Sequence, residues 1–193
     1  MMQLNLDLDQ KYGIMLSGGL DSAILLYTIL KNNASISIQP FTIPKVDGSI
    51  EFVNPLIQYF NETFYTDIPK TIQVGDPSVH HRLQSKTAVT DIFRNHKIDL
   101  LFIALNQNPP ELTNIPGAPN RSTKSDNPKI LMPFVNMHKD EILQIMYDFD
   151  QAYLAEITHS CTEQQIGRCS CCWQCTERAW AFSKLGKIDP GSR

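Results

Sequence analysis

The chain has 193 residues, of which 42% are hydrophobic and 19% are charged, and its formal net charge at pH 7 is -3. This length suits one domain of ordinary size with a substantial apolar core. The slightly acidic balance gives no electrostatic case for nucleic acid as an obligatory partner, and the basic residues are scattered rather than clustered.

The N-terminal arm, MMQLNLDLDQ, lacks the basic start and the long apolar run of a secretion signal. Elsewhere, no stretch approaches the ~18 consecutive apolar residues of a membrane span. We therefore predict a cytoplasmic protein without membrane contact. Within the arm, Leu4, Leu6 and Leu8 alternate with polar residues, which leaves either an edge strand or a loose segment.

Residues 11–29 form the most informative stretch, in which a short apolar strand runs through Ser-Gly-Gly-Leu-Asp-Ser into an apolar helix. Gly18 and Gly19 carry no Cβ, so the backbone can turn sharply and let a bulky anion approach its N–H groups. Because these N–H groups begin a helix, they lack intrahelical acceptors and lie at the positive end of its dipole. The junction therefore predicts a phosphate-binding loop in which Asp21 could hold a metal ion or a ribose. The candidate binding residues are Ser17, Gly18, Gly19, Leu20, Asp21 and Ser22.

Strand and helix patterns alternate through the following part of the chain. The predicted elements are a strand over 36–43, a helix over 51–64, a strand over 70–74, a helix over 78–95, a strand over 99–105 and an apolar segment over 130–134. The uninterrupted apolar run at 99–105 is typical of a strand covered on both faces. This alternation predicts an α/β fold with a doubly wound, mainly parallel, five-stranded sheet. The side chains expected to face inward from the helix over 78–95 are Val79, Leu83, Ala88, Val89, Ile92 and Phe93.

In an open parallel sheet, ligands bind outside the carboxyl ends of the strands. We therefore expect the backbone at Phe41 and Ile43 to contact an adenine ring, although a plain core strand is the alternative reading of these residues. Near the start of the long helix, Arg82 is a candidate for binding the nucleotide phosphates, and a solvated helix start is the alternative.

Residues 106–129 break the alternation, since they are rich in Pro, Asn and Ser and show no periodicity. A loop of this length in a compact domain is usually functional or disordered. It follows a predicted strand on the ligand side of the sheet, so we predict a substrate lid. The candidate residues in this loop are Asn106, Gln107, Glu111, Arg121 and Lys124.

All five cysteines lie between residues 161 and 175, four of them spaced C-x7-C-x2-C-x2-C. Two residues between thiolates let successive ligands turn back onto one tetrahedral ion, and four protein ligands close the site, as in structural metal centres. Thiolates suit zinc or an iron–sulfur cluster, and the spacing leaves that choice open. Cys171 falls between two ligands and is left over. The candidate metal ligands are Cys161, Cys169, Cys172 and Cys175.

Residues 177–185 are predicted to form a helix that docks the cysteine-rich segment onto the main domain. Its predicted inward side chains are Ala179, Trp180, Phe182 and Leu185. Arg178, in its first turn, is expected to face the metal loop and to suit an anionic substrate. We therefore divide the chain into a nucleotide-binding domain, residues 1–157, and a cysteine-rich segment with its C-terminal helix, residues 158–193.

The S-G-G-L-D-S loop, combined with the C-terminal cysteine motif and an arginine-containing helix, resembles the 7-cyano-7-deazaguanine synthase (QueC/ExsB) family of PP-loop ATP pyrophosphatases. Residues 133–142 resemble that family's P-[LF]-x(4)-K-x-E-[IV] stretch, and residues 160–162 resemble the entry to its zinc loop. The resemblance implies a Rossmann-like sheet of the adenine nucleotide alpha hydrolase type, ATP and Mg²⁺ at residues 17–22, and Zn²⁺ on the four cysteines. It also implies catalytic roles for Asp21 and for Lys139, whose ammonium would reach the phosphates; a first-turn surface lysine is the alternative.

The resemblance further implies an ATP-dependent carbon–nitrogen ligase of queuosine biosynthesis. Such an enzyme activates 7-carboxy-7-deazaguanine as an acyl-adenylate, lets ammonia displace AMP, and then adenylates and dehydrates the amide to 7-cyano-7-deazaguanine (preQ0). The expected partners are the deazapurine carboxylate and ammonia, and a homodimer is left open.

Two middle segments depart from the family pattern. The family's G-R-N stretch is absent, and residues 104–109 replace a segment that contains glycine and acidic residues. Because these segments hold the deazaguanine in the family, one alternative is a PP-loop enzyme that adenylates a different acid, a protein or a nucleic acid. A nucleotide-binding module without catalysis is another alternative.

Overall fold

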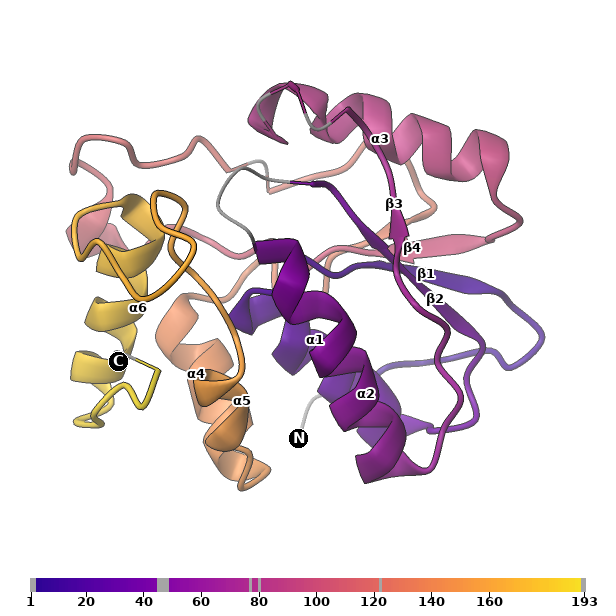
Figure 1. The fold of residues 1–193 in the computed structure, drawn as a ribbon, viewed down its shortest axis with the longest axis horizontal. Helices are drawn as coiled ribbons and strands as arrows, with labels where there is room; N and C mark the ends of the chain where they lie inside the picture. Colours follow the sequence, from indigo (N-terminus) through magenta and orange to yellow (C-terminus); the bar gives the residue numbers. More distant parts are fainter. Residues whose placement is uncertain (1–2, 45–48, 77, 80, 122, 192–193) are drawn as a thin grey trace.

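In this computed structural model, which describes residues 3–44, 49–76, 78–79, 81–121 and 123–191, five strands form one parallel sheet. Their order across the sheet is β3-β2-β1-β4-β5, so the first strand lies at the centre, between β2 and β4. The predicted five-stranded, doubly wound sheet is therefore confirmed (Figure 1). The strands are β1 (Tyr12–Met15), β2 (Ile38–Thr42), β3 (Ile72–Gln73), β4 (Leu100–Phe102) and β5 (Ile130–Leu131).

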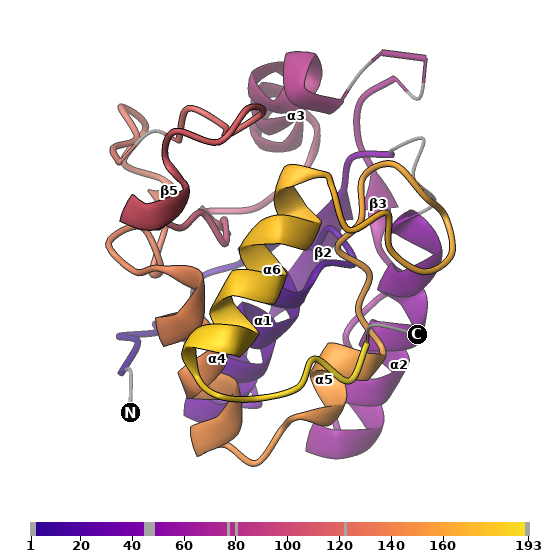
Figure 2. The same ribbon diagram turned by 90° about the vertical axis from the view of Figure 1, so that its left-hand side faces the viewer.

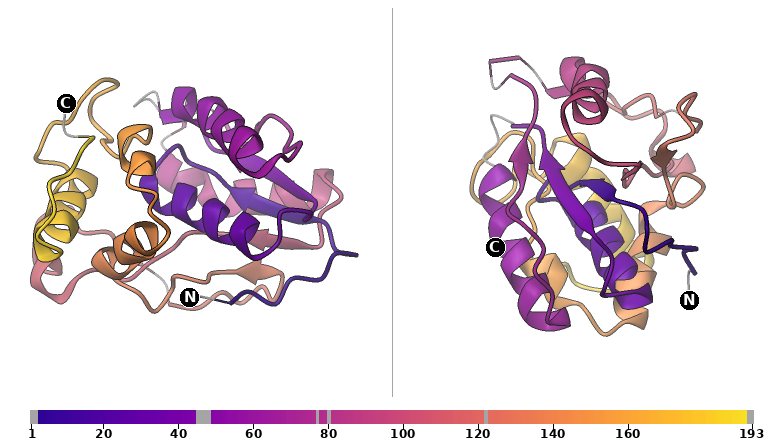
Figure 3. Two further views of the ribbon diagram at one scale, coloured as in Figure 1. Left: turned by 90° about the horizontal axis from the view of Figure 1, so that it is seen from below. Right: turned by 90° about the vertical axis from the view of Figure 1, so that its right-hand side faces the viewer.

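Helices cover both faces of the sheet. Figure 1 shows α3 on one side of the strands, with α1 and α2 on the other. The helices are α1 (Leu20–Asn32), α2 (Val53–Phe64), α3 (His81–Asn95), α4 (Lys139–Asp148), α5 (Tyr153–Glu156) and α6 (Trp173–Lys184), with short 3-10 turns η1 (Ser49–Phe52) and η2 (Pro110–Leu112). In the left view of Figure 3, the yellow C-terminal segment lies at one end of the molecule, and the indigo segment that leads into β1 turns at the other. No helix within the described ranges is long and apolar enough to span a membrane.

The core has two parts, one on each face of the sheet. The larger part joins α1, α2, α4, α5 and α6 to the sheet, and it includes Ile14, Leu25, Leu56, Leu143 and Phe182. The smaller part lies beneath α3, and its buried members are Phe41, Val74, Ala88, Ile92 and Leu101. Because Phe182 of α6 belongs to the larger part, the helix that follows the cysteines is packed into the main body of the protein.

The predicted inward face of α3 is partly wrong. Ala88 and Ile92 are buried, and Val89 and Phe93 pack against them, but Leu83 is 77% exposed. The reason is helical spacing: Leu83 shares its stripe with Thr87, Thr90 and Arg94, all exposed. The buried stripe instead runs through Gln84, Ala88 and Ile92. Val79, 38% exposed, precedes the helix.

The C-terminal helix also differs from its prediction. It begins at Trp173, so that Cys175 lies within it, and Ala179 is exposed while Ala181 is buried. The pattern misled because two charged residues, Glu177 and Arg178, occupy the buried side of the helix. They lie one turn before Ala181 and Phe182, so two of the six buried residues of the helix are charged.

Of the two alternatives for the N-terminal arm, the structure supports a loose segment. Residues 3–10 contain no strand, and Leu8 is exposed. The arm is held by Leu4 and Leu6, which pack against the core, and by a hydrogen bond from the Asp7 backbone N–H to the hydroxyl of Tyr12 (2.9 Å).

Candidate functional site

The predicted phosphate loop lies between the end of β1 and the start of α1 (Figure 1). Gly18 has a φ of 75°, in the left-handed region that only glycine enters without strain. Gly19 occupies the N-cap position of α1, and no described side chain caps the helix there. The first N–H groups of α1 therefore keep the positive, unsatisfied character that a phosphate complements.

Two serines hold the shape of this loop. The Ser17 backbone N–H donates to Ser22 Oγ (3.2 Å), and Ser22 Oγ donates to the Gly19 carbonyl (3.0 Å). The Gly18 carbonyl accepts a hydrogen bond from the backbone N–H of His159 (2.9 Å). The loop is thus joined to the segment that leads into the cysteines, so the two predicted motifs lie close together in space.

Lys139 is brought to the phosphate loop by α4, whose first residue it is. Its Nζ lies 2.7 Å from Asp21 Oδ2, and the lysine is 4% exposed, so it is not a surface lysine. Asp21 Oδ1 is also buried and has no hydrogen-bond partner in the described structure. Since a buried carboxylate oxygen normally has a partner, this atom is a candidate ligand for a cation.

A cavity of about 210 Å³ lies beside this pair, at the carboxyl end of the central strands. The phosphate loop forms one wall, and the segment before the cysteines and the first turn of α6 form another. The lining residues from the predicted set are Ser17, Gly19, Leu20, Asp21, Ser22 and Lys139. The carboxyl end of a parallel sheet is where this class of fold binds its ligands, so the cavity is the candidate active site.

Phe41 and Ile43 are not among the described residues that line this cavity. Phe41 is fully buried within β2, on the α3 side of the sheet, and its carbonyl accepts from the backbone N–H of Leu16 (2.8 Å). Ile43 lies just beyond the carboxyl end of β2, and its role stays a prediction. Arg82 lies in α3, but its side chain is outside the described part of the structure.

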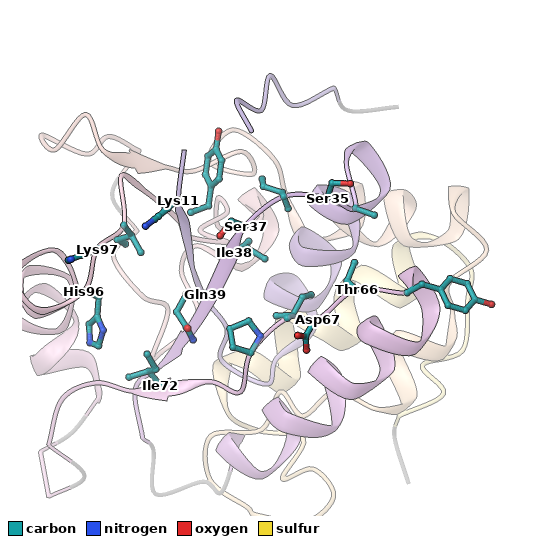
Figure 4. Close-up of a pocket in the computed structure, with 17 residues that line it drawn as sticks. Lys11, Ser35, Ser37, Ile38, Gln39, Thr66, Asp67, Ile72, His96 and Lys97 are labelled. Carbon is teal, nitrogen blue, oxygen red and sulfur yellow. The ribbon is translucent and has the colours of Figure 1, made fainter. Parts of the chain in front are cut away.

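A larger hollow, of about 630 Å³, lies at the opposite edge of the sheet (Figure 4). Lys11 precedes β1, Ser37 precedes β2, and His96 and Lys97 precede β4, so the hollow lies at the amino ends of the strands. None of the described residues lines both this hollow and the 210 Å³ cavity. Its position does not match the ligand-binding edge of an open parallel sheet.

Glu177 of α6 joins the cavity wall to the long loop over residues 106–129. The carboxylate is 1% exposed, and Arg121 holds it with both terminal nitrogens; the Arg121 Nη2 to Glu177 Oε2 distance is 2.9 Å. Asn106 Nδ2 donates to Glu177 Oε1 (3.3 Å), and Lys139 Nζ lies 3.7 Å from Oε2. Burial acts to raise the pKa of Glu177, but Lys139, Arg121 and Asn106 outweigh it and hold the pKa below its usual range.

Arg178 does not have the role that the sequence suggested. Its side chain is fully buried, and its guanidinium donates to both carboxylate oxygens of Asp189 (2.8 Å each) and to the carbonyl of Ala155 (2.6 Å). Ser160 Oγ accepts a further hydrogen bond (3.0 Å). Because the group is enclosed and satisfied, the prediction that it holds an anionic substrate is wrong; it ties the C-terminal tail to the main body.

Four cysteines form a compact sulfur cluster. The Sγ atoms of Cys161, Cys169, Cys172 and Cys175 all lie within 4.8 Å of one another, whereas Cys171 is exposed and outside the group. Backbone N–H groups point at the sulfurs: Cys172 N–H donates to Cys169 Sγ (3.2 Å), and Cys175 N–H donates to Cys172 Sγ (3.4 Å). Burial acts to raise the pKa of Cys169, but hydrogen bonds from the backbone and the thiols of Cys171 and Cys172 lower it to about 6, which favours the metal-binding thiolate.

His159, next to this cluster, has a structural position. Its Nε2 donates to the carbonyl of Gln164 (2.8 Å), and its ring stacks on Phe52 with the ring centres 4.8 Å apart. It does not belong to the sulfur cluster, so within the described structure it acts as a local hydrogen-bonding residue. His159 also lines the candidate cavity, as do Ser160, Thr162 and Gln174.

Two ion pairs between described residues attach the loop over residues 106–129 to α6. One is the buried Arg121–Glu177 pair, and the other is an exposed pair between Glu111 and Lys184 (3.0 Å). Of the candidates in this loop, Asn106 and Arg121 reach the cavity wall through Glu177, whereas Glu111 and Lys124 are exposed. The sequence analysis missed Glu177. What distinguishes this carboxylate is its contact with a partner that is distant in the sequence, and that contact forms only when the chain folds.

The comparisons with known proteins agree with this picture in part. The model of a family described as Queuosine biosynthesis protein QueC matches residues 111–186, which include Lys139, Glu177 and the four clustered cysteines but not the phosphate loop. None of the curated proteins compared with the sequence matches it. Among solved structures, the U34-tRNA thiolase NcsA from Methanococcus maripaludis with its [4Fe-4S] cluster is similar, with a TM-score of 0.49 and 17% identity over 97% of this chain and 70% of that one. The predicted resemblance to QueC is therefore confirmed over residues 111–186.

Proposed function

We propose that this protein is an ATP-dependent ligase that adenylates a carboxylate, and that 7-carboxy-7-deazaguanine with ammonia is its substrate pair and preQ0 its product. The observation that carries the proposal is the shared cavity: the phosphate loop, Lys139 and the residues around the cysteine segment line one space of about 210 Å³. The match to the QueC family over residues 111–186 supports the choice of substrate.

The residues of the cavity fit a magnesium nucleotide. The N–H groups at the start of α1 would bind phosphate oxygens, and Asp21, with one buried oxygen unpaired, would hold Mg²⁺. Bound there, Mg²⁺ would neutralise charge on the pyrophosphate leaving group. Lys139 would contribute a fixed positive charge at the same place, in a site where preorganised charges contribute most to catalysis.

The four cysteines fit a tetrahedral metal ion in a structural role. Four sulfurs within 4.8 Å of one another supply a complete ligand set, and backbone N–H groups donate to two of them, Cys169 Sγ and Cys172 Sγ. We propose Zn²⁺, and an iron–sulfur cluster is the alternative that metal analysis separates. Because α6 carries both Cys175 and Glu177, the metal would fix the start of the helix that forms one wall of the cavity.

An alternative function is adenylation of a different acid, a protein or a nucleic acid by the same loop. The observation that favours it lies after β4, where Asn106 is buried against Glu177 and the loop over 106–129 is attached to α6. This is the region in which the sequence departs from the QueC/ExsB pattern.

The two-part division at residue 157, the cytoplasmic location and a homodimer also stay predictions.

ATP–pyrophosphate exchange tests these proposals directly. The protein is incubated with ATP, Mg²⁺ and labelled pyrophosphate, with and without 7-carboxy-7-deazaguanine. Exchange that depends on this acid, followed by formation of preQ0 when ammonia is added, supports the proposed ligase. Exchange only with another acceptor supports the alternative, and ATP binding without any exchange supports a module that has no catalysis.

A further inference from the structure

Glu177 lies at the centre of a buried ionic network built from four separate parts of the chain. It is contacted by Arg121 and Asn106 from the loop over 106–129, and by Lys139 from α4, which in turn contacts Asp21 of the phosphate loop. This chain of charged contacts connects that loop to the phosphate site. Figure 2 shows α6 in front of α1 and beside α4, where such a bridge can form.

The charges of this network balance only when all four ionic groups are present. Lys139 lies between two carboxylates, at 2.7 Å from Asp21 and 3.7 Å from Glu177, and Arg121 offsets the second of them. A cation bound at Asp21 Oδ1 would leave Lys139 beside Oδ2, but it would draw on the charge of the same carboxylate. Glu177 would then be the carboxylate whose charge is left to hold the ammonium at the cavity, since a buried charge without a full counter-charge is costly.

We propose that Glu177 is a positioning residue: it holds Lys139 beside the phosphate loop when Asp21 is engaged by the nucleotide complex, and it couples Lys139 to the loop over 106–129 through Arg121. This inference rests on the proposed function, because it assumes that Mg–ATP binds at Asp21. It assigns to Glu177 a role in nucleotide binding that is separate from the fold-stabilising contacts of its neighbour Arg178.

The test measures the dissociation constant of Mg–ATP by titration calorimetry for the wild-type protein and for Glu177→Gln, which keeps the side-chain shape and removes the charge. We expect Glu177→Gln to raise the dissociation constant about tenfold, which corresponds to about 1.4 kcal/mol. Glu177→Asp should restore part of the affinity. Lys184→Gln is the matched control, because it breaks the exposed contact between the same loop and the same helix and should leave the affinity unchanged.

A double-mutant cycle separates positioning from a merely structural effect. In the Lys139→Met background, Glu177→Gln should change the dissociation constant less than twofold, because no ammonium is left to hold. Should Glu177→Gln fail to fold, Arg121→Gln takes its place in the same cycle, with an expected loss of affinity of about threefold that also vanishes in the Lys139→Met background.

The outcomes distinguish the two proposals. If the wild-type protein does not bind Mg–ATP, the proposed function is overturned, and this inference with it. If the wild-type protein binds Mg–ATP and Glu177→Gln binds equally well, the proposed function stands and the positioning role is overturned. An equal loss of affinity with and without Lys139 would also overturn it, because the effect would then not pass through the lysine.

Discussion

Lys139 Nζ lies 2.7 Å from Asp21 Oδ2, although the two residues are 118 positions apart in the chain. The pair joins the first turn of α4 to the first turn of α1, and both side chains line the candidate cavity. A positive group next to the start of α1 adds to the field of the helix dipole at the point where a phosphate would bind. The pair therefore lies at the centre of the candidate site, and its lysine is the first residue to substitute.

Substitution of Lys139 by Met should lower the rate of ATP–pyrophosphate exchange by about 10²-fold or more, as expected when one preorganised stabilising charge is removed. The methionine keeps much of the side-chain length and apolar volume, so the fold should survive. Exchange kinetics at saturating ATP, with thermal unfolding to verify folding, make the measurement. Lys139→Arg should retain more activity than Lys139→Met; equal activity of both variants and the wild-type protein would contradict a role at the phosphates.

The sequence predicted the glycine turn between β1 and α1 and the cysteine cluster because both are local. Gly18 and Gly19 define their turn within a few residues, and ligands spaced by two residues need no distant partner to come together. Glu177 could not be predicted in this way. It is a carboxylate on the buried side of a helix, and its partner Arg121 lies 56 positions away in a loop without periodicity.

The four clustered cysteines and Cys171 should behave differently. Cys175→Ser should abolish binding of one metal ion per chain, measured by elemental analysis, because it removes a buried ligand of the cluster. A ligand whose free concentration is 100 times its dissociation constant stabilises a protein by about 2.7 kcal/mol. Loss of the metal should therefore lower the unfolding temperature by about 5–10 °C. Elemental analysis also separates zinc from iron.

Cys171→Ser is the matched control for that experiment, since its sulfur is exposed and outside the cluster. It should retain the metal and the unfolding temperature of the wild-type protein. Loss of the metal in Cys171→Ser, with retention in Cys175→Ser, would show that the ligand set is assigned incorrectly.

The two stripes of α3 give a test of the fold. Ile92 is fully buried beneath the helix, so Ile92→Ala should lower the free energy of unfolding by about 3 kcal/mol through lost burial and a cavity. Leu83, although predicted to face inward, is exposed. Leu83→Ser should therefore change the free energy of unfolding by no more than about 0.5 kcal/mol. Urea unfolding followed by circular dichroism measures both. Similar losses in the two variants would mean that Leu83 is covered in solution.

Substitution of Asp189 should lower the free energy of unfolding more than most other substitutions in the C-terminal tail. Its carboxylate contacts two arginines, Arg168 in the cysteine loop and the fully buried Arg178 in α6, and it accepts a hydrogen bond from the backbone N–H of Gly191 (3.1 Å). Figure 2 shows the tail after α6 running back toward the cysteine loop, so this carboxylate closes the C-terminal segment on itself.

Asp189→Asn should lower the free energy of unfolding by about 3–5 kcal/mol, because it leaves the guanidinium of Arg178 buried without a counter-charge. Urea unfolding of the metal-loaded protein gives the value. Lys184→Gln, which removes an exposed ion pair on the same helix, should cost no more than about 1 kcal/mol. If Asp189→Asn were as mild as Lys184→Gln, the tail would not be closed onto Arg178, and that arginine would again be available to an anionic ligand.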